Sequence, residues 1–413
     1  MPGRQVGDAA VTTTVRTSTQ TLPTATLWLA GGWTLSSTAD SFLLFVLLWI
    51  AGPQGWSGVE TAILVVAVRL PTLLGGVLGG RAVDRFGPVR MMMLDGAART
   101  ALMGGLVIAG ADGTFDIWIV LALGATAGAT APLSYSAART LIPRQVPPEL
   151  LGKANALLSI GDQLPMLLGA VLAGPALSLL GPGPAFVLPL LMMLGVTAIV
   201  FALRRTPTYD VDPVPSSPGQ ARRRRPKAVI ALIGLSVAYY FTYGPYETVL
   251  PYFVRDQLGS GLGGYTLLWA LFGGTALLSL PAAARLSRGR PGLVNAVGAI
   301  AWGGLMLPLA FTDHLVIAAV GFAVAGAIWG PYSAIETTAL QRWTDPRDHG
   351  RIFGTQRALL ALAAPIGAAA GAVAADQFSP TPILAASATG CTLAGAIACA
   401  IPTLRRRSNG TDW

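Results

Sequence analysis

Twelve long apolar runs divide the chain, and each is bounded by charged residues or by glycine and proline. About 20 predominantly apolar residues let a helix cross the hydrocarbon core of a bilayer, and every run is long enough to do so. The pattern therefore predicts an all-α membrane protein with twelve transmembrane helices. Their expected limits are residues 26–51, 57–79, 91–111, 117–138, 153–179, 183–203, 228–253, 264–284, 292–312, 314–338, 352–375 and 380–403.

Three polar segments flank or interrupt these runs. Residues 1–25 are rich in threonine and lack the apolar core of a signal peptide, so we expect an N-terminal tail. Residues 204–227 are rich in proline, serine and charge, and they separate six runs from six. The expected organisation is therefore a bundle at 26–203, a linker, a second bundle at 228–403, and a tail at 404–413.

Charge gives the expected orientation in the membrane. Of the 413 residues only 11% are charged, whereas about 25% is usual in soluble proteins. The net charge of +9 would suggest a nucleic-acid partner in a soluble protein. Here almost all of the 28 lysine and arginine residues fall in the tails, the linker and alternate connections. The positive-inside rule then predicts a plasma-membrane protein with both termini and the linker in the cytoplasm, and no nucleic-acid partner.

The two halves of the chain resemble each other. Tyr135–Ala137, at the end of the fourth run, matches Tyr332–Ala334 at the end of the tenth. Shortly after each match, Gly152–Lys153 corresponds to Gly350–Arg351. Two parallel six-helix repeats are typical of transporters whose substrate site lies between the repeats near the middle of the bilayer. The alternative is a chance similarity between helices rich in alanine and glycine.

The connection between the second and third runs carries a spaced set of glycines and charges: Gly80, Asp84, Arg85, Gly87 and Arg90. This spacing resembles the G-x-x-x-D-R-x-G-R-K loop of the major facilitator superfamily, although Pro88 and Val89 stand where the family prefers basic residues. The resemblance covers residues 26–403 and is nearest to the branch that exports drugs, macrolides and siderophores. It implies two pseudo-symmetric six-helix bundles that alternate between open states.

Within that resemblance, the loop is expected to be a conformational switch. Gly80 and Gly87 permit a tight turn. Asp84 can pair with Arg85, or it can meet the positively polarised N-terminus of the eleventh helix, in one global state and not in the other. The alternative is a plain turn whose arginines hold the loop in the cytoplasm, which explains the basic residues but not Asp84 or the glycine spacing.

Charged residues inside the apolar runs are the candidates for ion coupling. Each would cost about 2.5–3.5 kcal/mol alone on insertion scales. The family fold places the first, fourth, seventh and tenth helices around the cavity, so Asp40 is expected to take up a proton, with Arg69 adjusting its affinity. The alternative is a static Asp40–Arg69 ion pair. Glu247, between Pro245 and Pro251 in a helix expected to be kinked or unwound there, is the second candidate; its alternative is simple exposure to external water.

Two further polar pairs are expected to contribute to helix packing. Asp95 and Arg99 are four residues apart in the third run, a spacing that favours an intrahelical ion pair of structural role. Asp162 and Gln163 lie in the fifth run, which the family fold places at the interface between the halves. For this second pair, a functional contact and a plain hydrogen-bonded helix contact are both open.

Arg139 and Glu336 follow the matched motifs at equivalent positions with opposite charge. They are a candidate inner gate, bridged when the cavity faces outward. Aromatic residues on the first, fourth, seventh and tenth runs are the candidate cavity lining, namely Trp33, Tyr135, Tyr239, Tyr243, Tyr246, Trp329 and Tyr332. Such a lining suits large lipophilic or amphipathic cargo. The alternative for each aromatic residue is core packing or a place in the interfacial belt.

The sequence carries no Walker-type phosphate loop, so ATP-driven transport is not expected. No nucleophile–base arrangement lies at membrane depth, and neither an enzyme nor a metal or cofactor site is predicted. The predicted function is secondary active export of a hydrophobic or amphipathic small molecule by a monomer, coupled to protons or another cation. The alternatives are import or facilitated movement of a metabolite or lysolipid, and a membrane sensor or scaffold that transports nothing.

Overall fold

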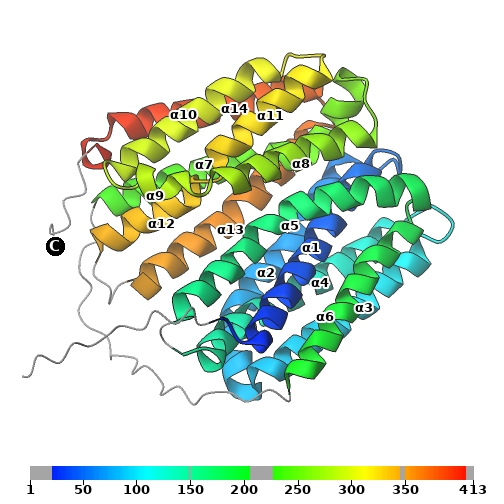
Figure 1. Ribbon diagram of the computed structural model, residues 1–413. Coiled ribbons are helices and arrows are strands. Elements are labelled where there is room, and N and C mark those ends of the chain that lie inside the picture. Colours follow the sequence, from blue (N-terminus) through cyan, green and yellow to red (C-terminus); the bar gives the residue numbers. More distant parts are fainter. Residues whose placement is uncertain (1–20, 148–149, 205–226, 345–348, 406–413) are drawn as a thin grey trace, which may run out of the picture.

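The computed structural model describes residues 21–147, 150–204, 227–344 and 349–405. Within these ranges the side chains of residues 72–80, 143, 151–152, 155–156, 159, 162 and 349–350 are not described. The described chain is almost entirely helical and contains no strand. Its helices form two six-helix bundles that lie side by side (Figure 1), which confirms the predicted fold class. The predicted linker and both tails lie almost wholly outside the described residues.

The first bundle contains α1 (Thr24–Ala51), α2 (Gly58–Phe86), α3 (Pro88–Ala109), α4 (Ile117–Gln145), α5 (Leu151–Leu180), the short 3₁₀ turn η2 (Pro184–Phe186) and α6 (Val187–Leu203). Local signals start and stop these helices. Ser57 and Glu60 form a capping box at the start of α2, and Asp116 accepts hydrogen bonds from two backbone N–H groups at the start of α4. Gly87, at φ +87°, ends α2 immediately before Pro88 begins α3.

The second bundle contains α7 (Lys227–Tyr252), η3 (Phe253–Gln257), α8 (Leu262–Ser279), α9 (Ala282–Leu286), α10 (Pro291–Leu309), α11 (Leu315–Trp329), α12 (Tyr332–Trp343), α13 (His349–Ala374), α14 (Pro380–Ala400) and η5 (Pro402–Leu404). The predicted eighth and tenth spans are each divided in two. The divisions fall at Pro281 and at Gly330–Pro331, because proline lacks the N–H that a continuous helix needs.

Eleven segments of the described chain are long and apolar enough to cross a membrane, and α2, with 29 residues, supplies the remaining predicted crossing. The prediction of a locally unwound segment around Glu247 is wrong, whereas a kink there stays a prediction. Helix α7 continues through Pro245 and Pro251, and the irregularity comes afterwards, as the π-helical turn η3. At membrane depth an unwound segment would leave backbone groups unbonded, so continuation of the helix is favoured.

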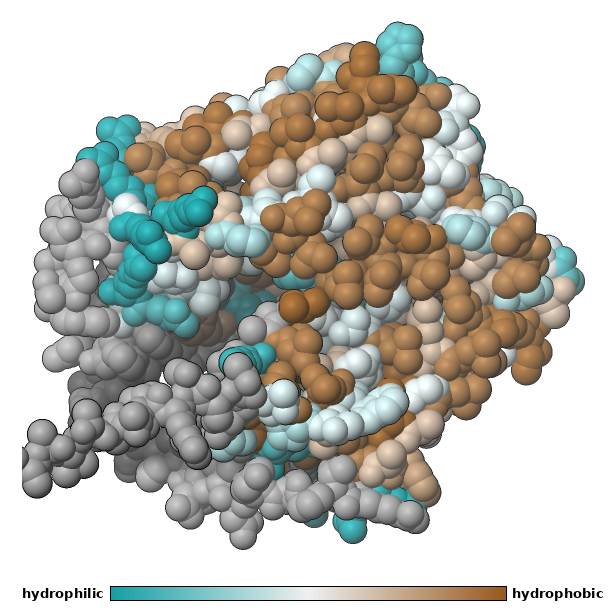
Figure 2. Space-filling view, in the orientation of Figure 1, coloured by the Kyte–Doolittle hydropathy of each residue, from teal (hydrophilic) through white to brown (hydrophobic). Residues whose placement is uncertain are grey.

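Contacts between α2 and α13, and between α5 and α8, join the two bundles. We call the end where α1 begins and η5 lies the terminal end, at the left of Figure 1, and the end with the loops at 52–57, 253–261 and 375–379 the distal end. Figure 2 shows a broad hydrophobic face across both bundles, with hydrophilic residues gathered towards the ends. This distribution is the one expected of helices surrounded by lipid.

Candidate functional site

A cluster of two carboxylates and one guanidinium lies inside the first bundle. Arg99 on α3 donates hydrogen bonds to Asp40 on α1 and, at 2.7 Å, to the hydroxyl of Ser36. The Nη1 of Arg99 also lies 3.5 Å from Oδ2 of Asp95, one helical turn away on α3. Ser134 on α4 donates to the same oxygen of Asp95. These five residues, which we call the carboxylate–arginine cluster, tie together three helices.

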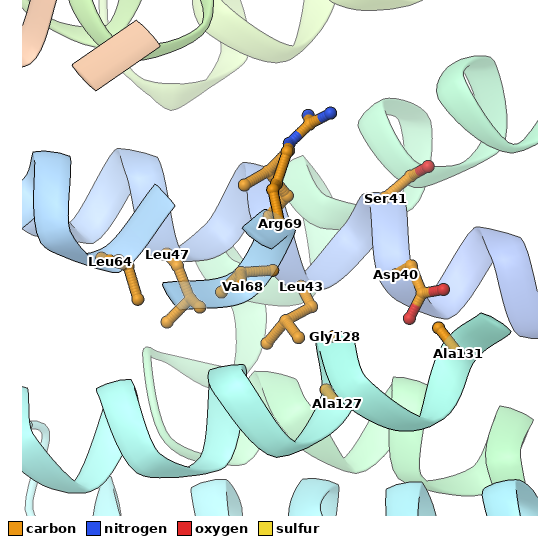
Figure 3. A pocket seen from close by; sticks show the side chains of 11 residues that line it. Asp40, Ser41, Leu43, Leu47, Leu64, Val68, Arg69, Ala127, Gly128 and Ala131 are labelled. Atoms are coloured by element: carbon orange, nitrogen blue, oxygen red, sulfur yellow. The ribbon is translucent and has the colours of Figure 1, made fainter. Parts of the chain in front are cut away.

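Burial differs sharply across the cluster. The side chains of Arg99 and Asp95 are 1% and 0% exposed, whereas that of Asp40 is 42% exposed. Asp40 lines a cavity of about 280 Å³ between α1, α2 and α4. Figure 3 shows Asp40 beside Ala131 of α4, with leucine side chains from α1 and α2 forming much of the remaining wall. One carboxylate therefore faces open space, and the other lies in the protein interior.

The sequence predicts that Arg69 lies near Asp40, and the structure places both residues on one cavity with different ionic partners. Both residues line the cavity, but Arg69 extends from α2 towards the second bundle (Figure 3). There its Nη2 lies 2.9 Å from both carboxylate oxygens of Glu247 on α7. The static Asp40–Arg69 pair is therefore wrong, because each residue has another partner. Glu247 is also not exposed to external water, since only 10% of its side chain is accessible.

A second, smaller cavity of about 180 Å³ lies where the bundles meet. The Arg69–Glu247 ion pair and Tyr243 form part of its lining, together with Phe45 and Trp269. We call the contact surface between the two bundles the seam. Arg69 lines both cavities, so its side chain lies between the cavity in the first bundle and the cavity at the seam. This places an ion pair that links the two bundles at the centre of the candidate transport site.

Most of the predicted lining aromatics on α7 and α12 instead fill the core of the second bundle. Tyr239, Tyr246 and Tyr332 are at most 3% exposed, and Tyr239 packs against Trp302 with ring centroids 5.6 Å apart. Trp329 packs on the same cluster, with its ring centroid 4.5 Å from that of Tyr243. Helices that are apolar all round give no indication of which face is buried, so the sequence could not separate lining from core. Of this group, Tyr243 reaches a cavity wall.

Trp33 and Tyr135 lie nearer the terminal end. Arg139 places its guanidinium carbon 3.5 Å from the ring centroid of Tyr135, and Trp33 packs edge-on against the same ring. Arg357 on α13 donates to the Tyr135 hydroxyl across the seam. Glu336, the other candidate gate residue, is 1% exposed inside the second bundle. The bridge between Arg139 and Glu336, expected when the cavity faces outward, stays a prediction.

Two contacts that the sequence did not reveal hold the bundles together at the distal end. Asp376, just after α13, accepts hydrogen bonds from the backbone N–H groups of Gly58 at 2.6 Å and Val59 at 3.2 Å. Arg255, just after α7, lies 3.5 Å from the carbonyl oxygen of Trp49 near the end of α1. An anion thus meets the N-terminus of α2 and a cation the C-terminus of α1, as both helix dipoles favour. We call these two contacts the distal latch.

Close packing along the distal half of the seam accompanies this latch. Phe45 and Trp49 of α1 contact Tyr265 of α8, with ring centroids 6.2 Å and 5.3 Å apart. A methyl group on Gly58 would overlap the carbonyl oxygen of Ala372, so only glycine permits this approach of α2 to α13. The seam is therefore closed at the distal end.

The loop between α2 and α3 lies at the terminal end. Asp84, Arg85 and Arg90 are exposed, and within the described part of the chain the Asp84 carboxylate has neither an ion pair nor a hydrogen bond. Gly80 belongs to the stretch of α2 whose side chains are not described. The same holds for Asp162 on α5, whereas its neighbour Gln163 is half-buried.

Two six-helix bundles with charged groups at membrane depth define a multi-pass membrane transporter. A model of the Major Facilitator Superfamily matches residues 29–342, and the chain belongs to that family. The family and the structural neighbours are transporters rather than enzymes. The resemblance read from the loop between α2 and α3 is confirmed.

Relatives of known sequence include an uncharacterized MFS-type transporter, y4rN, of Sinorhizobium fredii, which is 28% identical over 85% of this chain and 89% of its own length. The multidrug efflux pump Tap of Mycobacterium tuberculosis is 24% identical over 90% of this chain and 92% of its own length. Both are similar along almost their whole length, so the likeness includes both bundles.

Solved structures share the fold at low sequence identity. A bacterial homologue of the human lysosomal transporter Spinster, inward-facing and unoccupied, aligns with a TM-score of 0.67 and 14% identity, covering 91% of this chain and 93% of that one. A bacterial metal transporter aligns with a TM-score of 0.63 and 16% identity, covering 92% of this chain and 98% of the other.

Proposed function

We propose that this transporter exports a hydrophobic or amphipathic small molecule in exchange for protons, by alternating access of the two bundles. The observation that carries the proposal is Asp40, a carboxylate exposed in a largely apolar cavity at membrane depth and held by Arg99. An ionisable group in such a place is expensive and is best explained by function. Leucine walls favour lipophilic cargo, and the efflux activity named for the relative Tap is consistent with export.

The Arg69–Glu247 ion pair is the second element of the proposal. It joins α2 to α7 across the seam. If the bundles separate at this depth, either the ion pair breaks or its two side chains move with the bundles to stay in contact. A substrate or proton that binds Glu247 would compete with Arg69 and thereby loosen one contact between the bundles. Ligands shift a conformational equilibrium only through such differential contacts.

We propose further that the protein acts as a monomer in the plasma membrane, with the terminal end in the cytoplasm. The excess of lysine and arginine at that end supports this orientation. The closed distal end would then be external, and the conformation would be open to the cytoplasm. In the opposite conformation Asp84 would meet the N-terminal end of α13, which gives the α2–α3 loop its switch role.

The test uses everted membrane vesicles that carry a preset pH gradient. Addition of ethidium, an amphipathic fluorescent cation, is expected to dissipate the gradient in vesicles with the wild-type protein and not in vesicles with Asp40→Asn. Uptake of the dye that is unaffected by collapse of the gradient would instead identify facilitated movement. A cysteine introduced at Ser216 in the linker should react with a membrane-impermeant reagent in everted vesicles and not in intact cells.

A further inference from the structure

The carboxylate–arginine cluster does not balance its own charge. It contains two carboxylates, Asp40 and Asp95, and one guanidinium, Arg99, which stays protonated in proteins. With both carboxylates ionised the cluster carries one net negative charge inside the membrane. One bound proton makes it neutral. Because uncompensated charge is costly at this depth, the neutral, singly protonated form is a low-energy state of the cluster.

Asp95 is not fully satisfied by its contacts. One of its oxygens, Oδ2, faces Arg99 and accepts a hydrogen bond from Ser134, whereas Oδ1 is buried and has no hydrogen-bond partner among the described residues. Within the described part of the chain, the Nε of Arg99 is likewise buried and without a hydrogen-bond partner. A purely structural ion pair would be expected to use these groups, since each unpaired buried polar atom costs about 1–3 kcal/mol. Asp95 Oδ1 can therefore accept a proton, and Arg99 Nε can form a further hydrogen bond if the side chains rearrange.

We propose that Asp40, Asp95 and Arg99 form a single site that binds one coupling proton for its two carboxylates together. The inference deepens the proposed function, on which it rests, by assigning a second carboxylate to the proton site and a stoichiometry of one proton. A proton enters from the cavity at Asp40, whose carboxylate becomes a carboxylic acid. Arg99 then keeps Asp95 as its counter-ion, so α3 and α4 stay linked while the bond to α1 weakens.

The surroundings add few other charges. On α1 and α6 there is no titratable residue besides Asp40. Arg69 of α2 faces the same cavity as Asp40 but is paired with Glu247 of α7. The titratable residues of α4 are Tyr135, which directly follows Ser134, Arg139, whose guanidinium lies against the Tyr135 ring, and Arg144 near the end of the helix. On α5 the side chain of Asp162 is not described, and Lys153 is exposed at the terminal end.

The test is a pH titration of the purified protein in nanodiscs, followed by the infrared C=O stretching band of protonated carboxyl groups. The wild-type protein should show a protonation step of one carboxyl group that disappears in Asp40→Asn and also in Asp95→Asn. Each substitution leaves one carboxylate, and Arg99 balances its charge. The remaining carboxylate therefore stays ionised without a proton. Asp112→Asn, at an exposed loop residue, is the control and should keep the step.

If Asp40 bound the proton independently of Asp95, the step would persist in Asp95→Asn, and that result overturns the proposal. Ser134→Ala provides a second measurement with no change of charge, in case Asp95→Asn fails to fold. Loss of the donor to Asp95 should move the midpoint up by about one pH unit, because a hydrogen bond to a charged group favours the ionised form. An unmoved midpoint also overturns the proposal. The titration contains no substrate, so its result does not depend on transport. Loss of the step in both variants would support the shared proton site even if vesicles showed no proton-coupled export.

Discussion

Removing one charge from the distal latch should open the distal end. Asp376 lies at the N-terminus of α2, where it accepts two backbone hydrogen bonds from the other bundle. Asp376→Asn keeps an oxygen acceptor but loses the negative charge. A carboxylate at an exposed helix N-terminus contributes about 0.3–1 kcal/mol through the dipole, and a hydrogen bond to a charged group exceeds one to a neutral group by about 1 kcal/mol. Since Asp376 is exposed, we take about 1 kcal/mol, which corresponds to about a fivefold shift in the equilibrium between closed and open distal ends.

The shift can be measured by double electron–electron resonance between spin labels at Asp112→Cys and Asp313→Cys. These residues lie in exposed distal loops of different bundles, and neither contacts the latch. The native Cys391 and Cys399 would first be replaced by alanine. The ratio of the longer-distance to the shorter-distance population should rise about fivefold in Asp376→Asn.

The matched control is Asp256→Asn, which removes a negative charge from the same end at an exposed residue beside Arg255. It should leave the distance distribution unchanged. If Asp376→Asn also leaves the distribution unchanged, the contact with α2 contributes nothing to closure. If both substitutions open the distal end equally, the net charge of this end controls its closure. The specific contact between Asp376 and α2 is then refuted as the cause.

Three further predictions concern other contacts. Arg69→Gln should lower the stability measured by thermal unfolding by about 1–3 kcal/mol, because it leaves Glu247 buried without its partner, and the exchange Arg69→Glu with Glu247→Arg should recover part of the loss. Asp84→Asn should leave the distal distances of this conformation unchanged, but it should destabilise the opposite one and so act against Asp376→Asn in a double variant. For the candidate inner gate, Arg139→Glu and Glu336→Arg should each reduce transport and their combination should restore it; absence of rescue would exclude the bridge.

The membrane spans could be predicted because twenty-residue apolar runs are a strong signal, and even the division into two bundles follows from one polar segment. Intramembrane charge likewise identified Asp40, Arg69 and Glu247 as candidate site residues, and all three line the cavities of the candidate site. Their partners could not be predicted. Asp40 pairs with a residue 59 positions away, Arg69 with one 178 positions away, and Asp376 reaches Gly58 across 318 positions. A helix that is apolar on every side carries no record of its rotation about its axis, and these pairings depend on that rotation.

One helix connects the proposed proton site to the distal latch. Helix α1 carries Asp40, held by Arg99 within the first bundle, and Trp49, whose carbonyl group meets Arg255 of the second. Trp49 is nine positions after Asp40, so the two residues lie about 13 Å apart along one continuous helix. On the proposed mechanism, protonation of Asp40 would weaken the attachment of α1 to α3, while Arg255 would still attach α1 to the second bundle. We therefore expect the distance between Asp112→Cys and Asp313→Cys to depend on pH in the wild-type protein and to lose that dependence in Asp40→Asn. If the pH dependence survives in Asp40→Asn, protonation of Asp40 does not control the distal latch.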